Sequence, residues 1–121
     1  MQVQLKRVYD AASDDDGLRI LIDKLWPRGI KKENLRCDLW EKNISPSDAL
    51  RKAFHADVDG YWNDFRKEYS EQLDESASFA DLISRLRKTN PEKVTLLYAF
   101  KNQTKNNALI VRDKILSSLK K

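Results

Sequence analysis

"VTLLYAF", residues 94–100, is an almost unbroken apolar run between Asn90–Pro91 and the polar stretch KNQTKNN. A short run of this kind is typical of a strand that is covered on both faces, as in a parallel sheet packed against helices. It therefore predicts a central strand, and the other elements can be placed around it.

Three further strands are predicted on the N-terminal side of this run. Residues 3–8 (VQLKRV) alternate like a half-buried strand, residues 18–23 (LRILID) are mostly apolar, and residues 38–42 (DLWEK) form a short extended segment. The loop at 9–17 leaves open whether the first two strands are parallel or antiparallel. Its DDDG stretch lacks the later glutamate of a calcium loop, so we expect a solvated turn there.

Four helices are predicted from capping residues and apolar spacing. The first begins at Ser45 as N-cap, with Pro46 at the first helical position and Asp48 completing an arrangement like a capping box. The second spans about 58–75, where apolar and aromatic residues recur at helical spacing. The third opens at Ser78 and ends at residues 90–91, and the fourth spans 107–119 after a cap at Thr104 or Asn106. This order predicts an α/β fold, a small and mostly parallel sheet of about four strands flanked by helices, within one compact domain over residues 1–121.

Composition excludes several classes of protein. The 121 residues carry a net charge of +4, which favours anionic ligands but is too small for a dedicated DNA-binding face. One cysteine and one histidine can form neither an intrachain disulfide nor a structural zinc site, so we expect no metal and no cofactor. No apolar run approaches the roughly 20 residues of a membrane helix, and the first residues do not resemble a signal peptide. We therefore expect a cytoplasmic protein without a membrane partner.

A candidate ligand site follows from the strand ends. Ligands of open parallel sheets bind beyond the carboxyl ends of the strands. Asp23 ends the second predicted strand, and Lys101 follows the strand at 94–100. In LWPRGI (25–30), Pro27 and Gly29 would fix the loop path, while Trp26 anchors it and Arg28 points into the crevice. The alternative is structural: Trp26 covers the core, and Arg28 pairs with Asp23 or another carboxylate to brace the turn.

The first helix adds a second candidate group. Ser47, Arg51 and His55 lie at i, i+4 and i+8, on one stripe near a helix N-terminus, and suit a phosphate or carboxylate. His55 is the one evident candidate for general acid–base catalysis. In the structural alternative, Ser47 is simply a residue of the first turn, Arg51 is a surface or bracing cation, and His55 is a partly buried residue at the helix end. Cys37 is interpreted as a half-buried structural cysteine rather than a nucleophile.

The chain also resembles a known family. The blocks that carry the resemblance are RVYD, RILIDKLWPRGI, DLWEKNISPSDALRKAFH, FRKEYSEQL and TLLYAFKNQTKNNALIV, in this order from residue 7 to residue 111. They resemble the YeaO-like proteins, small bacterial and archaeal proteins within domain-of-unknown-function family 488. The resemblance implies a compact α/β domain and brings no accepted reaction, substrate or cofactor. Lys24 stands where arginine is usual, which keeps the charge but loses bidentate geometry, and Phe100 and Asn102 alter the usual end of the LLYA block.

Three functions remain open from sequence. The leading hypothesis is binding of a small anionic ligand, a nucleotide or phosphorylated metabolite, at the strand carboxyl ends. Arg28, Arg51, His55 and Lys101 would hold it, and Asp23 would orient Arg28 or accept from a ligand hydroxyl. A nucleic-acid-associated regulatory protein is an alternative, although no recognition motif is present. An oligomeric interaction module is another, which an exposed Trp62 would favour. Catalysis and oligomeric state are left open.

Overall fold

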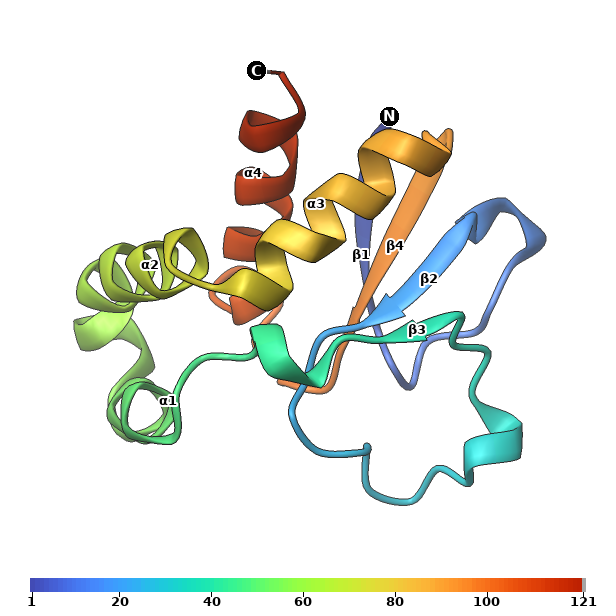
Figure 1. Ribbon diagram of the computed structural model, residues 1–121. Helices are drawn as coiled ribbons and strands as arrows, with labels where there is room; N and C mark the ends of the chain where they lie inside the picture. The colour runs from blue at the N-terminus through green and yellow to red at the C-terminus, as the bar shows by residue number, and fades with distance from the viewer. Residues whose placement is uncertain (121) are drawn as a thin grey trace.

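The computed structural model describes residues 1–120, which form a four-stranded sheet with four α-helices. The strands are β1 (Gln2–Arg7), β2 (Leu18–Leu21), β3 (Leu39–Trp40) and β4 (Lys93–Tyr98), in the order β1-β4-β2-β3. Every pairing is parallel, so the α/β class and the parallel sheet are confirmed. β4 lies between β1 and β2, which also settles the direction of these first two strands (Figure 1).

The central place of β4 explains its apolar sequence. Leu96 is aligned with Leu5 of β1 and with Ile20 of β2, so that three aliphatic side chains lie side by side on one face of the sheet. Val94, Leu96 and Leu97 are all fully buried. A strand with neighbours on both edges and cover on both faces has no position for a solvated side chain, as the run at 94–100 predicts.

All four helices lie on the same side of the sheet and contribute to one core there, with α1 and α2 further from the strands (Figure 1). They are α1 (Asp48–Ala56), α2 (Val58–Asp74), α3 (Ala77–Thr89) and α4 (Asn107–Leu119). Their apolar faces meet Ile20, Ile22, Val94 and Leu96 in the main core. On the opposite face, Val8, Leu21 and Leu97 form a smaller cluster with Leu35 from the loop before β3. The second face of β4 is therefore covered by loops. No helix within residues 1–120 is long and apolar enough to cross a membrane.

Two predicted helix starts were wrong by two residues. Ser47, not Ser45, caps α1, and its Oγ accepts from the Leu50 N–H at 3.2 Å. Ser45 instead donates to the Lys42 carbonyl and closes the short 3-10 helix η3 (Lys42–Ile44). In α3 the cap is Ser76, not Ser78. Each segment offers two serines two residues apart, and sequence alone does not decide between them. Asn106 caps α4, as one of the two expected alternatives.

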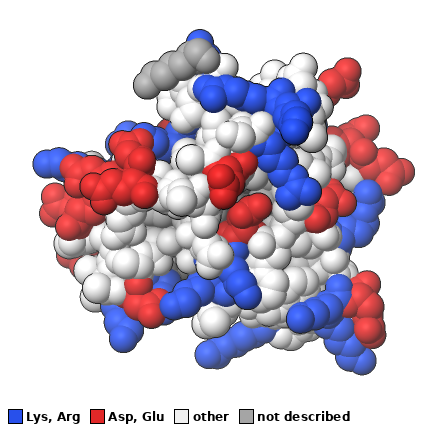
Figure 2. Space-filling model, viewed as in Figure 1, with Lys and Arg blue, Asp and Glu red and all other residues white. Residues whose placement is uncertain are grey.

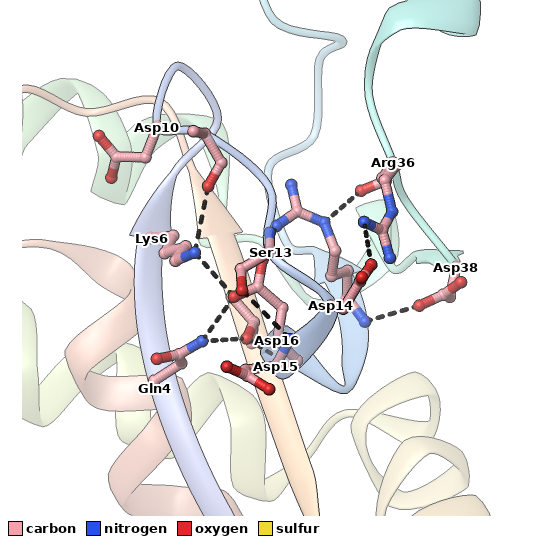
Figure 3. A network of polar contacts seen from close by, with 12 residues as sticks. Gln4, Lys6, Asp10, Ser13, Asp14, Asp15, Asp16, Arg36 and Asp38 are labelled. Atoms are coloured by element: carbon pink, nitrogen blue, oxygen red, sulfur yellow. Dashed lines mark hydrogen bonds and ion pairs between the residues drawn. The ribbon is translucent and has the colours of Figure 1, made fainter.

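The expectation of a solvated DDDG turn holds for Asp14, Asp15 and Gly17, which are exposed, but it was wrong for Asp16, which is only 1% exposed. Since β1 and β2 are parallel, the chain must return across the sheet between them, and this return carries the 3-10 helix η1 (Asp14–Asp16) onto the face without helices. There the Asp16 carboxylate pairs with Arg19 and, at 2.7 Å, with Lys6 (Figure 3). Gln4 Nε2 and the Ser13 N–H also donate to it, each at 3.0 Å.

This network holds Asp16 ionised. Burial by itself raises the pKa of a carboxyl group, but hydrogen bonds from Lys6, the Ser13 backbone and Arg19 outweigh that effect. The pKa of Asp16 consequently lies well below its ordinary value. Arg19 is itself 2% exposed, so each charge of this pair depends on the other.

Candidate functional site

A cavity of about 500 Å³ opens at the carboxyl edge of the sheet. Its walls come from segments that are distant in sequence: the residues after β1, the loop after β2, α1 with the residues before it, α2, the residues after β4, and the start of α4. Figure 1 shows these segments meeting toward the lower ends of the strands, beside α1. The parallel direction of the strands gathers these segments, because it brings all the carboxyl ends to one edge.

Six of the seven candidate ligand residues from the sequence line this cavity. They are Asp23, Trp26, Arg28, Arg51, His55 and Lys101. Ser47 does not line it. Its side chain is exposed and is used by the α1 cap and by a hydrogen bond from Gln72 Nε2 at 3.0 Å. The predicted helical stripe therefore contributes only Arg51 and His55 to the site.

The loop at 25–30 is a braced frame. Trp26 Nε1 donates to the Ile30 carbonyl at 2.6 Å, and its ring contacts Trp40 edge-on with centroids 5.4 Å apart. Gly29 has φ of 78°, in the left-handed region that glycine tolerates best. The Tyr9 hydroxyl donates to the Arg28 carbonyl at 3.1 Å. The backbone of this loop is thus held from several sides.

The frame presents the Arg28 side chain to the cavity. Arg28 is exposed, and within residues 1–120 its guanidinium has no hydrogen-bond or ion-pair partner. The same holds for the ammonium group of Lys101 in that described part of the chain. Arg28 therefore does not form the ion pair with Asp23 that the structural alternative requires within residues 1–120. The side chains of Arg28 and Lys101 are both available to bind a ligand.

Asp23 ties the carboxyl end of β2 to β4 and α4. Its Oδ2 accepts from the Ala99 N–H at 2.8 Å, and its Oδ1 accepts from Asn107 Nδ2 at 3.2 Å. Burial raises the pKa of the Asp23 carboxyl group, while these hydrogen bonds and the nearby charge of Arg51 oppose the rise. Among residues 1–120, Asp23 is the single carboxylate on the cavity wall.

Arg51 and His55 face the cavity from successive turns of α1. The imidazole of His55 stacks on Phe100, with centroids 4.6 Å apart and planes 7° apart. Burial, together with the charge of Arg51, lowers the pKa of His55 from 6.5, so the ring is predominantly neutral at pH 7. Arg51 reaches Asp48 at 3.4 Å, and its Nε is buried without a partner within residues 1–120. Lys24, which stands where the family usually has arginine, is held by Asp48 at 3.1 Å.

Sequence reasoning missed most of the apolar wall. Phe54 and Phe65 are 2% and 1% exposed and close the inner end, while Leu25 is 66% exposed at the mouth. Phe54 and Phe65 read as ordinary helix-core positions, and only the fold shows that a cavity reaches them. Tyr9 and Asn107 also line the cavity. Both come after the carboxyl end of a predicted strand, so the strand-end rule could have identified them as candidate site residues.

The charge distribution around the cavity is uneven. Figure 2 shows lysine and arginine side chains along the lower edge of the molecule, toward α1 and the loop after β2, and acidic side chains gathered over α2. No group of three histidine, cysteine or carboxylate side chains suited to a metal ion is found in the part of the chain that the structure describes. Cys37 donates to the Leu39 carbonyl, and burial raises the pKa of its thiol, which makes it a poor nucleophile.

Comparison with known proteins places the chain in a family. A family model described as "Inactive DUF488-N3 subclade" matches residues 2–121. The uncharacterized protein YeaO of Escherichia coli K12 is 48% identical over 113 residues, covering 93% of this chain and 96% of YeaO. The uncharacterized protein Rv3073c of Mycobacterium tuberculosis is 33% identical over 110 residues, covering 91% and 90% of the two chains. No solved structure matches. The chain belongs to the DUF488-N3i family and is a homologue of YeaO.

Proposed function

We propose that this protein binds a small anionic ligand, a nucleotide or phosphorylated metabolite, in the cavity at the strand carboxyl ends. One observation carries the proposal. Arg28 and Lys101 lie at the mouth of a cavity of about 500 Å³, and neither has an ion-pair partner within residues 1–120. Sites for small molecules and cofactors have volumes of roughly 300–1,000 Å³ and combine apolar walls with a few polar groups.

The chemistry of the lining favours phosphate or carboxylate. A guanidinium donates two parallel hydrogen bonds to such groups, and its charge strengthens both. The aromatic wall of Phe54, Phe65 and Phe100 supplies contact area for the body of the ligand. The family description "inactive" favours binding over catalysis. A chain with one cysteine needs no oxidising compartment, which is consistent with a cytoplasmic site of action.

The direct test is a ligand screen by thermal shift, followed by calorimetric titration. The probes are inorganic phosphate, nucleoside monophosphates, sugar phosphates and organic acids. We expect at least one probe to raise the melting temperature of the wild-type protein. Arg28→Ala should abolish that shift while leaving the unliganded melting temperature nearly unchanged, because Arg28 is exposed and unpaired within residues 1–120. Arg85→Ala on α3 is the matched control, since it removes the same charge away from the cavity. Equal ligand binding by both variants would contradict the proposal.

The nucleic-acid alternative has one observation in its favour. Lys32 lies 6.0 Å from the ring centroids of both Trp26 and Trp40, and Lys42 lies 5.3 Å from that of Trp40. Basic groups beside aromatic rings can hold single strands. Binding of this kind weakens steeply as salt rises, so a titration with oligonucleotide between low and moderate salt separates it from metabolite binding. The interaction-module alternative loses its main argument, because Trp62 packs on Phe54 with centroids 5.7 Å apart and is half-buried.

A further inference from the structure

The charged groups of the cavity are unevenly placed, with cations at the mouth and a carboxylate further in. Arg28 and Lys101 are exposed at the mouth, whereas Asp23 is half-buried and fixed against the ends of β4 and α4. Beyond this wall, Phe54 and Phe65 close the inner end. An anionic group of a ligand at the mouth is attracted by both cations. The same group beside Asp23 would be repelled by the carboxylate, and the repulsion would be strong because Asp23 is partly shielded from water.

Asp23 also keeps hydrogen-bonding capacity. Each of its oxygens accepts one hydrogen bond from the protein, at 2.8 Å from Ala99 and at 3.2 Å from Asn107. Because a carboxylate oxygen carries two lone pairs, both oxygens retain an acceptor position. A ligand group beside Asp23 therefore has to donate, through N–H or O–H.

Arg51 places a donor on the same lining. Its side chain is 37% exposed, and the ion pair that it makes with Asp48 is long at 3.4 Å. Arg51 and Asp23 line the same cavity, and the charge of Arg51 opposes the rise in the pKa of Asp23. Together they present carboxylate acceptors beside guanidinium donors.

We propose that the ligand binds with its anionic group outward at Arg28 and Lys101, and with a ring that carries two neighbouring donors and one acceptor inward against Asp23 and Arg51. This inference rests on the proposed function and narrows its ligand class. Among nucleobases, guanine offers this edge: its N1–H and N2 amino groups match a carboxylate, and its O6 matches a guanidinium. Adenine presents an acceptor, N1, where guanine has a donor, and that lone pair would face Asp23.

The test is a calorimetric titration of the wild-type protein with a ladder of nucleotides that differ only at this edge. Guanosine monophosphate has both donors, inosine monophosphate lacks the amino group, and adenosine monophosphate replaces N1–H by an acceptor. We expect binding to weaken in that order, with the guanine nucleotide about tenfold or more tighter than the adenine nucleotide, the effect of about one to two hydrogen bonds to a charged group. Guanosine without phosphate should bind more weakly than its monophosphate.

Two variants separate the ends of the ligand. Asp23→Asn should reduce the preference for guanine over adenine to near unity, because its amide presents one acceptor and one donor. Arg28→Ala should abolish measurable binding of all three nucleotides alike, because it removes the contact to the phosphate that they share, and Arg85→Ala should change nothing. If Asp23→Asn does not fold, the wild-type ladder decides the question, since it needs no variant.

The failures of the two proposals are distinguishable. Equal affinities across the ladder, weakened by Arg28→Ala, would overturn the donor-edge inference and leave the anion site standing. Absence of binding by every nucleotide, sugar phosphate, organic acid and inorganic phosphate would overturn the proposed function and this inference with it.

Discussion

Replacing Asp16 by asparagine removes the negative charge at the centre of the buried network, with little change in side-chain volume. Arg19, only 2% exposed, then becomes a buried cation without its counter-charge, whereas Lys6, whose side chain is 23% exposed, can turn toward water. Breaking a buried pair by removing one partner costs about 3–5 kcal/mol. For a chain of 121 residues this corresponds to a fall in melting temperature of roughly 10–20 °C.

The same pair predicts a pH dependence. The folded-state pKa of Asp16 lies below its unfolded value, which is about 3.9. Its stabilising contribution is therefore fully present above that value, and it is lost as the pH falls toward the folded-state pKa. The difference in unfolding free energy between wild type and Asp16→Asn should be constant from about pH 5 to pH 8 and should shrink below about pH 4.

The assay is urea unfolding followed by circular dichroism at several pH values, with Asp14→Asn as the matched control. Asp14 belongs to the same 3-10 helix, but its side chain is fully exposed and pairs with Arg36 at 3.3 Å, so its replacement should leave stability unchanged. If Asp16→Asn and Asp14→Asn unfolded at the same urea concentration, the reasoning about the buried charge would be refuted.

Three other positions carry predictions. Gly17→Ala should destabilise the fold severely, because Gly17 has φ of 66° and an added Cβ would lie 2.2 Å from the Lys93 carbonyl oxygen; normal thermal stability would refute this clash. Tyr69→Phe should cost about 1–3 kcal/mol in urea unfolding, since it leaves the buried Ile44 carbonyl without its 2.6 Å hydrogen bond; an unchanged midpoint would show that the bond contributes nothing. The lowered pKa of His55 means that protonation opposes folding, so stability should fall as the pH drops through 6.5, and His55→Gln should flatten that slope; identical slopes would count against it.

Much of the fold could be predicted because its strands have strong local signals. The apolar run at 94–100 indicates a central strand, and the aromatic spacing at 58–75 indicates an amphipathic helix. For parallel strands, the strand-end rule then predicts that Asp23, Arg28 and Lys101 lie at one edge of the sheet. The elements could be predicted because they depend on residue spacing, which is a local property, whereas the edge at which these residues lie depends on the parallel direction of the strands, which the sequence left open.

The remainder depends on long-range packing. DDDG has the composition of an exposed turn, and only the parallel return of the chain from β1 to β2 buries Asp16. The choice between Ser45 and Ser47 as the cap of α1 depends on η3, which immediately precedes this pair of serines. The apolar inner end of the cavity had no sequence signal, because Phe54 and Phe65 also fit an ordinary helix core.

The central claim is that the cations at the strand ends hold an anionic ligand. The most direct measurement is a calorimetric titration of wild type, Arg28→Ala and Arg85→Ala with the nucleotide or phosphorylated compound that gives the largest thermal shift. The account predicts saturable binding by wild type and Arg85→Ala, and no measurable binding by a folded Arg28→Ala. Undiminished binding by Arg28→Ala would contradict it.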